Sequence, residues 1–365
     1  MPGINDITSF LIINPFGIGD CLFTTPLMSL LRDHFPAAKI YFLCNQKTYP
    51  VVRDHPLVEK AFIYERDDFV KIRKISFLQW VRAYAAFIAA IRRERIDVCV
   101  DLSLNTQYGF YAWAAGIRRR FGLDYKKRCF FLNKKIPISG FNDKHVADYY
   151  LDTARFLDLP AFRHSMSIGI GAQDKTWAED WISRHKIREF PVIIGVAPCG
   201  GDSFGPNAYI KRWPADHYSA LIGLLREKYN AAVLVFAGPK ESSDANAIIG
   251  CAGSGQGVYD LSNTTLGQTM ALIAHCSLFI GNDTGALRFA DALGKKLIAF
   301  YGPGDDTVYG PYPYEKGRTV VLKKDLACRP CYKRFRLSAC EHDRECLRSI
   351  SVKEAFDAAQ TLLKN

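Results

Sequence analysis

A run of small and polar residues between two apolar segments carries the clearest chemical signal in the sequence. Asp283, Thr284 and Gly285 follow the apolar run 278–280 and precede a segment with helical periodicity, 285–293. Where a buried strand leads into a helix, the first backbone N–H groups and the helix dipole favour an anion. The run therefore predicts a pyrophosphate site. The alternative is that Asp283 or Thr284 only caps the helix.

Two more loops in the second half of the chain carry residues that suit a phosphate or a sugar. Lys211 and Arg212 stand just before Pro214, a residue that is tolerated in the first turn of a helix, and their charges can clamp a phosphate. Glu241 comes soon after the apolar run 232–237 and can either cap the next helix or bind a sugar hydroxyl. The alternatives are a solvent-exposed Lys–Arg pair and a simple helix cap.

A candidate base lies near the start of the chain. Gly17 and Gly19 allow a tight turn after the apolar run 10–14, and Asp20 then stands at the start of the expected helix 21–33. A carboxylate there can cap the helix, or it can accept a proton from an incoming hydroxyl. Because the third glycine of the dinucleotide-binding fingerprint is missing, the turn is poor evidence for a dehydrogenase.

These loops must be positioned by a sheet, and the pattern of the whole chain predicts one. Short apolar runs alternate with longer amphipathic segments, which is typical of βα units with parallel strands. The pattern stops between residues 162 and 189 and then restarts, so we expect an α/β protein with two doubly wound, Rossmann-like domains. The expected strands are 10–14, 40–44, 61–64, 98–102, 192–197, 232–237, 278–282 and 296–301, and the expected helices include 21–33, 77–93, 145–157, 215–229, 241–249, 266–275 and 285–293.

Length and composition agree with two globular domains. The chain has 365 residues, of which 48% are hydrophobic and 23% are charged, as in soluble globular proteins. The sequence shows no secretory signal and no run of 18 apolar residues, so we expect a cytoplasmic protein.

Positive charge is concentrated in the first half. The net charge is +11, and residues 1–165 hold 24 Lys and Arg against 16 Asp and Glu, a net +8. The alternative to an anionic partner is a set of solvated faces. The residues that we expect to bind an anionic acceptor are Arg118, Arg119, Arg120, Lys126, Lys127 and Arg128.

Cysteines raise a separate question. Seven of the 11 are scattered along the chain, as expected of reduced thiols. The other four, with CxxC spacing followed by two more, could present thiolates to one structural Zn or Fe ion. The alternative is free thiols or a loop capable of forming a disulfide. These four are Cys328, Cys331, Cys340 and Cys346.

Taken in order, the motifs resemble those of glycosyltransferase family 9, the ADP-heptose:lipopolysaccharide heptosyltransferases. The resemblance implies a GT-B fold, in which two Rossmann-like domains face a central cleft. Residues 1–170 would bind the acceptor, residues 171–350 the nucleotide-sugar, and a helix in 351–365 would cross back to the first domain. The motifs are the GxGD turn with TxP at 17–26, LRxxFPxAxI at 31–40, KRWP at 211–214, a GxxxE-like element at 238–241, and DTG with ALGKxxxxxxGPxD at 283–305.

The resemblance also implies an activity. Asp20 matches the family's catalytic base for an inverting displacement, which requires no cofactor or metal for catalysis. One departure is Arg288, where the family commonly has His; arginine could add charge for the diphosphate, or it could indicate a different donor. The implied partners are ADP-heptose and an anionic glycolipid or glycan, such as the lipopolysaccharide inner core, with peripheral contact at the inner membrane face. The positions that match donor-binding residues are Lys211, Glu241, Asp283, Thr284 and Gly285, beside Arg212 and Arg288.

Three alternatives remain open. Autotransporter heptosyltransferases, which modify protein serines and bind iron, have similar cysteine-bearing tails. A nonenzymatic nucleotide-sugar-binding protein would have no need for Asp20 at the acceptor side. A zinc module that binds nucleic acid would not explain Asp20, the KRWP element or the DTG turn, so we expect no nucleic-acid partner.

Overall fold

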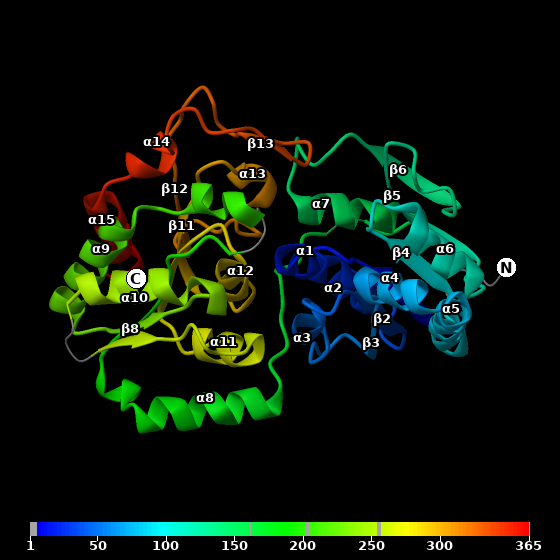
Figure 1. Cartoon of the computed structure of the whole chain (residues 1–365), viewed down its shortest axis with the longest axis horizontal. Helices are drawn as coiled ribbons and strands as arrows, with labels where there is room; N and C mark the ends of the chain where they lie inside the picture. The colour runs from blue at the N-terminus through cyan, green and yellow to red at the C-terminus, as the bar shows by residue number, and fades with distance from the viewer. Residues whose placement is uncertain (1–5, 161, 202–204, 254–256, 365) are drawn as a thin grey trace. The chain divides into compact units, whose positions relative to one another are not determined.

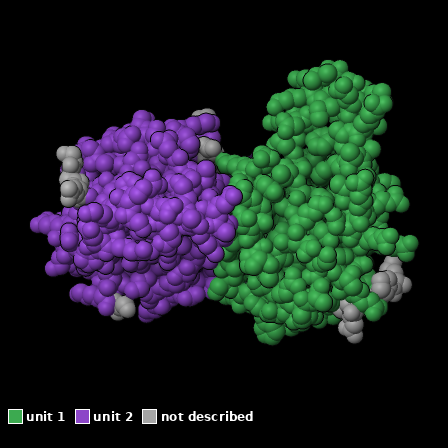
Figure 2. Space-filling model, turned by 90° about the horizontal axis from the view of Figure 1, so that it is seen from below, with its two compact units in different colours: residues 1–169 green, residues 170–365 purple. Residues whose placement is uncertain are grey.

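The chain divides into two compact units, residues 1–169 and 170–365 (Figure 2). The structure is a computed structural model that describes residues 6–160, 162–201, 205–253 and 257–364. Each unit contains a six-stranded parallel sheet flanked by helices (Figure 1), which confirms the predicted α/β fold. Among the described residues, no helix combines the length and the apolar character needed to cross a bilayer.

The first unit has the strand order β3-β2-β1-β4-β5-β6. Its strands are β1 Ser9–Ile13, β2 Lys39–Cys44, β3 Lys60–Ile63, β4 Val98–Asp101, β5 Arg119–Tyr125 and β6 Lys134–Ile138. Its helices are α1 Ile18–Phe23, α2 Thr25–His34, α3 Tyr49–Val52, α4 Arg66–Ile75, α5 Phe77–Arg93, α6 Thr106–Ala114, α7 Val146–Leu151 and the 3₁₀ helix η2 Asp152–Leu157.

The second unit repeats this order as β12-β11-β10-β7-β8-β9. Its strands are β7 Ile193–Ala197, β8 Ala232–Val235, β9 Val258–Asp260, β10 Leu278–Asn282, β11 Lys296–Phe300 and β12 Thr319–Leu322, with a small hairpin of β13 Tyr332–Lys333 and β14 Arg336–Leu337. Its helices are α8 Ala172–Arg184, η3 Ile187–Glu189, η4 Gly205–Lys211, α9 Ala215–Tyr229, η5 Pro239–Glu241, α10 Ser242–Cys251, α11 Leu266–Ile273, α12 Gly285–Ala292, α13 Asp306–Tyr309, α14 Glu345–Arg348 and α15 Val352–Lys364.

Both sheets are buried on both faces, which explains why their strands read as continuous apolar runs. All five residues of β1 are buried, as are all five of β10. In the first unit β1 pairs with β2 and β4, and in the second unit β7 pairs with β8 and β10. The order in which the chain adds strands therefore reverses at β1 and at β7. In open parallel sheets this reversal is where ligands bind, outside the carboxyl ends of the strands.

One expected helix differs from the structure, and another packs within the second unit. The helix expected over 21–33 is two helices, because Thr24 ends α1 and Pro26, which lacks an N–H group, occupies the first turn of α2. The helix α15 belongs to the second unit, where Ala355, Ala359 and Leu362 join the apolar core. The resemblance also implies that a helix in residues 351–365 crosses back to the first domain, and this stays a prediction.

Candidate functional site

Asp20 lies beyond the carboxyl end of β1, in the first turn of α1. Its Oδ2 accepts the backbone N–H of Gly17 at 3.3 Å, and the hydroxyl of Tyr150 donates to Oδ1 at 3.4 Å. The side chain of Asn14 donates to the backbone oxygen of Asp20 at 3.1 Å and holds the turn against the sheet. Asp20 therefore closes the turn and, being only half-buried, also presents a carboxylate at the sheet edge.

A second carboxylate at the same edge was not singled out from the sequence. Asp101 ends β4, pairs in register with Ile13 of β1, and is completely buried. Burial raises the pKa of Asp101 to about 6, although its hydrogen bond from the backbone N–H of Ser103 at 2.8 Å opposes the rise. Its Oδ2 has no hydrogen-bond partner among the described residues. Only the strand order, which sets β4 beside β1, could have indicated this neighbour.

The six expected acceptor residues separate into two groups. Residues 118–120 lie at the amino end of β5, and residues 126–128 follow its carboxyl end, about 20 Å away along the strand. Because the sheet is parallel, residues 126–128 share the edge of Asp20 and residues 118–120 lie at the opposite edge. The guanidinium of Arg120 also binds the backbone, because its Nε donates to the oxygen of Phe131 at 2.6 Å. The geometry thus favours Lys126, Lys127 and Arg128 as acceptor contacts.

In the second unit, Asp283 lies between two cations. Lys211 Nζ is 3.0 Å from Asp283 Oδ2, and Arg288 Nη2 contacts Oδ1. Burial alone would raise the pKa of Asp283, but the charges of Lys211 and Arg288 hold it below the usual value. The three side chains carry one excess positive charge at the carboxyl end of β10. Such a group attracts an anion.

The start of α12 adds donors to this charge. Thr284 precedes the helix in an extended conformation, and no side chain caps it. The capping role considered for Asp283 or Thr284 is therefore not the one that the structure shows. Thr284 Oγ1 is buried and has no hydrogen-bond partner in the described part of the chain. An unpartnered hydroxyl beside the uncapped amino end of a helix fits the oxygens of a phosphate.

Arg288 supports this loop from inside. It is 3% exposed, and its guanidinium also binds the Tyr301 hydroxyl at 2.6 Å and the backbone oxygen of Tyr309. So buried a position favours a role in positioning Asp283 over direct contact with a diphosphate, and the donor contact considered from the sequence stays a prediction.

Asn282 connects the loops that carry Lys211 and Asp283, a role that sequence reasoning missed. Its Oδ1 accepts the backbone N–H of Trp213 at 3.0 Å, and its Nδ2 donates to the oxygens of Pro198 at 2.8 Å and Cys199 at 3.2 Å. A completely buried amide thus ties the end of β10 to the segments that follow β7 and precede α9. The loops that carry Lys211 and Asp283 are held in one arrangement as a result.

Glu241 braces the neighbouring loop. Its Oε1 accepts the backbone N–H groups of Gly200 at 3.1 Å and Gly201 at 3.0 Å, and Arg212 Nη2 lies at 3.0 Å from the same oxygen. Its Oε2 accepts the N–H of Gly238 at 3.4 Å. Glu241 does not cap α10, since the structure assigns that helix no side-chain cap. The carboxylate instead fixes the backbone after β7 beside Thr284.

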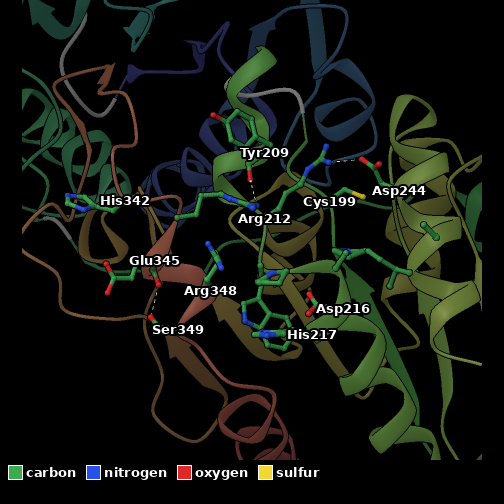
Figure 3. Close-up of a pocket in the computed structure, with 17 residues that line it drawn as sticks. Cys199, Tyr209, Arg212, Asp216, His217, Asp244, His342, Glu345, Arg348 and Ser349 are labelled. Carbon is green, nitrogen blue, oxygen red and sulfur yellow. Dashed lines mark hydrogen bonds and ion pairs between the residues drawn. The ribbon is translucent and has the colours of Figure 1, made fainter.

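A cavity of about 1030 Å³ lies in the second unit beside these loops. Figure 3 shows Arg212 and its ion pair with Asp244 in its wall, together with residues of α9 and α14. Its lining holds equal numbers of opposite charges, so the cavity has no marked preference for an anion. This balance of charge gives no reason to move the predicted pyrophosphate site from Asp283 and Thr284 to the cavity. The charged residues of the lining are Arg212, Arg344, Arg348, Asp216, Asp244 and Glu345.

The four clustered cysteines do not form the metal site that the sequence suggested. Cys340 is exposed, whereas Cys346 is buried in the apolar core of the second unit. Burial raises the pKa of Cys346 to about 11, with smaller contributions from the other thiols, and burial also raises that of Cys331. Among the described residues, which include all four cysteines, no three His, Cys, Asp or Glu side chains are arranged to hold a metal ion. The predicted structural Zn or Fe therefore lacks support.

Comparisons with known proteins agree with the two-domain α/β fold. Lipopolysaccharide heptosyltransferase 2 of Escherichia coli K12 is 25% identical over 329 residues, which cover 86% of this chain and 87% of that relative. A crystal structure of a family 9 glycosyltransferase from Veillonella parvula superposes with a TM-score of 0.78 at 20% identity and covers 99% of this chain and 98% of that one. The E. coli ADP-heptose lipopolysaccharide heptosyltransferase II gives a TM-score of 0.74 at 22% identity, with 98% and 99% covered.

The two solved structures support the GT-B fold, and the family match supports more. The family described as glycosyltransferase family 9 (heptosyltransferase) matches residues 84–341, which is most of the chain. This match includes all of β7 to β12, the six strands of the second sheet. The chain is a glycosyltransferase and belongs to glycosyltransferase family 9.

Proposed function

We propose that this glycosyltransferase moves a heptose from ADP-heptose to an acidic acceptor, the inner core of lipopolysaccharide, at the cytoplasmic face of the membrane. The observation that carries the proposal is the Asp283 group, where a net positive charge, an uncapped helix start and an unpartnered threonine hydroxyl meet at one sheet edge. This combination can stabilise the negative charge of a diphosphate leaving group. The names of the similar enzymes give the sugar and the acceptor.

The proposed reaction is a single displacement with inversion. Asp20 takes the proton of the acceptor hydroxyl as its oxygen forms a bond to the anomeric carbon. The bond from that carbon to the diphosphate breaks, and its electron pair leaves with ADP. Lys211 and the start of α12 stabilise the negative charge that develops on the departing oxygen. Asp283, Arg288 and Glu241 keep these groups in place before the substrate arrives.

Residues 126–128 supply the acceptor contacts in this proposal. Their three positive charges follow β5 at the edge where Asp20 lies, and an inner-core acceptor with phosphate or carboxylate groups would be attracted there. A protein acceptor, as in autotransporter heptosyltransferases, is the second candidate, and the relative named above favours the glycolipid.

A panel of nucleotides tests the donor. ADP-heptose and ADP should raise the unfolding temperature of the purified protein more than UDP- or GDP-sugars do, because a ligand that binds only the folded state stabilises it. Equal stabilisation by all diphosphate nucleotides would contradict the proposed donor. Transfer by wild-type protein, with none by Asp20→Ala, would separate an enzyme from a nonenzymatic binding protein.

A further inference from the structure

The turn between α4 and α5 exposes apolar side chains that the proposed reaction does not use. Of the eleven large hydrophobic side chains exposed among the described residues, five fall within residues 70–81. Figure 1 shows the two helices of the first unit that carry them. We call this group the α4–α5 patch, and it consists of Val70 (42% exposed), Ile75 (78%), Phe77 (67%), Leu78 (58%) and Val81 (40%).

The patch is additional to the face with which these helices pack. Phe69 of α4 and Trp80 of α5 both contact the ring of Tyr84, with centroids 4.5 and 4.9 Å apart. Tyr84 in turn meets the hydroxyl of Tyr64 at 3.0 Å, and Phe87 packs against the core of the unit. Since the inner faces are already filled with aromatic rings, the outer apolar residues have no core left to join in the described unit.

Positive charge surrounds the patch. Residues 70–82 contain four basic side chains and no Asp or Glu. The guanidinium of Arg73 lies over the ring of Trp80 at 5.5 Å. The acidic residues of α4, Asp67 and Asp68, lie in its first turn, where they favour the helix dipole, and Asp68 Oδ1 also pairs with Lys71 Nζ at 3.2 Å. The four basic residues are Lys71, Arg73, Lys74 and Arg82.

We propose that the α4–α5 patch docks on the surface of a membrane that contains anionic lipids. Apolar side chains that alternate with Lys and Arg at a helix surface insert at the boundary of headgroups and acyl chains, while the cations contact lipid phosphates. A second copy of the chain would bring Arg73, Lys74 and Arg82 against the same three cations, so charge complementarity selects the lipid. A single patch of this size gives reversible, salt-sensitive binding.

The location suits the proposed acceptor. The helix α4 starts three residues after β3 ends, at the carboxyl edge of the sheet beside which Asp20 also lies. Docking there would keep the first unit on the surface from which a lipid-anchored acceptor projects. This role rests on the proposed function, whereas lipid binding itself does not.

Vesicle co-sedimentation of the full chain tests the proposal. Vesicles of phosphatidylethanolamine with phosphatidylglycerol should bind the wild type, and phosphatidylcholine vesicles should bind it far less. The double variant Lys74→Glu/Leu78→Ser should lower the partition onto the anionic vesicles about tenfold or more. Its matched control, Tyr314→Ser/Lys316→Glu, removes one exposed aromatic side chain and reverses one charge in the second unit, and it should bind as the wild type does.

Three results would overturn the proposal. Wild-type protein that ignores anionic vesicles would do so, and so would a Lys74→Glu/Leu78→Ser variant that binds them normally. A wild-type dimer that the same variant converts to monomer, without vesicle binding in either form, would assign the patch to a second copy. The last outcome is read by analytical ultracentrifugation.

Transfer to a lipid-free core oligosaccharide separates this proposal from the proposed function. The Lys74→Glu/Leu78→Ser variant should transfer heptose to that acceptor at the wild-type rate, because no membrane is involved. Asp20→Ala should bind vesicles normally and transfer nothing. Vesicle binding by a wild type that transfers no heptose would contradict the proposed function and leave the membrane surface standing.

Discussion

The two units share one strand order but surround the carboxylate near their switch point differently. In the first unit, the Asp20 carboxylate contacts a backbone N–H and a phenol hydroxyl. In the second, Asp283 is clamped by the ammonium of Lys211 and the guanidinium of Arg288. A catalytic base must be able to accept a proton, whereas a diphosphate site needs cations and N–H donors that are already in position. In the proposed reaction, the same strand order would thus serve proton transfer in one unit and leaving-group binding in the other.

Removing the base should have the largest effect. Asp20→Asn keeps an oxygen that can accept the N–H of Gly17 but cannot take the acceptor proton. We expect kcat for heptose transfer to fall about 10³-fold, with ADP affinity by calorimetry within about twofold of the wild type. The control Asp67→Asn, on exposed α4, should leave both unchanged. A tenfold loss of ADP affinity in Asp20→Asn would place the residue in the donor site instead.

Replacing Arg288, which pairs with Asp283, should lower the stability of the protein. Arg288→Met leaves the partly buried Asp283 carboxylate with one cation fewer, and we expect a loss of about 3 kcal/mol in the free energy of unfolding near neutral pH. Arg288→Lys should lose less, since it keeps the charge. Chemical denaturation measures both. If Arg288→Met matches the wild type in stability, the ion pair is not structural.

The pH dependence of this loss has a definite sign. The pKa of Asp283 in the folded state lies below its usual value of 3.8, so its stabilisation is present above about pH 4 and disappears as pH falls through the folded pKa. The stability difference between wild type and Arg288→Met should therefore shrink on acidification. A difference that grows toward low pH would contradict the charge assignment.

Lys211 should affect donor binding in addition to stability, because it is buried and pairs with the same carboxylate as Arg288. Lys211→Ala removes the ammonium 3.0 Å from Asp283 at the helix start, and we expect ADP to bind about 10- to 100-fold more weakly. Lys240→Ala, a nearby exposed lysine, is the matched control. Calorimetric titration of ADP into both variants measures the difference, and equal affinities would remove Lys211 from the proposed site.

The smallest effect is expected at Asp101, and it runs in the opposite direction from Asp283. Burial raises the pKa of Asp101 from 3.8 to about 6, so the charged form destabilises the fold as pH rises through that interval. Asp101→Asn should stabilise the protein by about 1 kcal/mol near pH 8 and have little effect near pH 4. Unfolding at the two pH values measures this. Destabilisation of equal size at both would show that the carboxylate is needed for packing.

Local features of the fold and site followed from the sequence, and long-range ones did not. The turn at residues 283–285 was predictable because strand, turn and helix are neighbours in the chain. The strand β5 was missed because its first two residues are arginines, and β9 because it has only three residues. The inward position of Arg288 depends on Tyr301 and Tyr309, which no local pattern connects to it.

The partner groups at the site were hidden for the same reason. Tyr150 reaches Asp20 across 130 positions of sequence, and Asn282 reaches Pro198 across 84. Positive runs were visible in the sequence, but only the strand register shows that residues 118–120 and 126–128 lie at opposite edges. The exposed apolar residues of α5 also match a helical pattern, and only the packed structure separates them from those that face the core.

Transfer of the sugar itself tests the central claim most directly. Wild-type protein would be incubated with ADP-heptose and a lipopolysaccharide inner-core acceptor, and the products followed by mass spectrometry and by the NMR signal of the anomeric proton. The account predicts an acceptor enlarged by one heptose with inverted anomeric configuration, and one ADP released for each transfer. An unchanged acceptor with intact ADP-heptose, or a product of retained configuration, would contradict it.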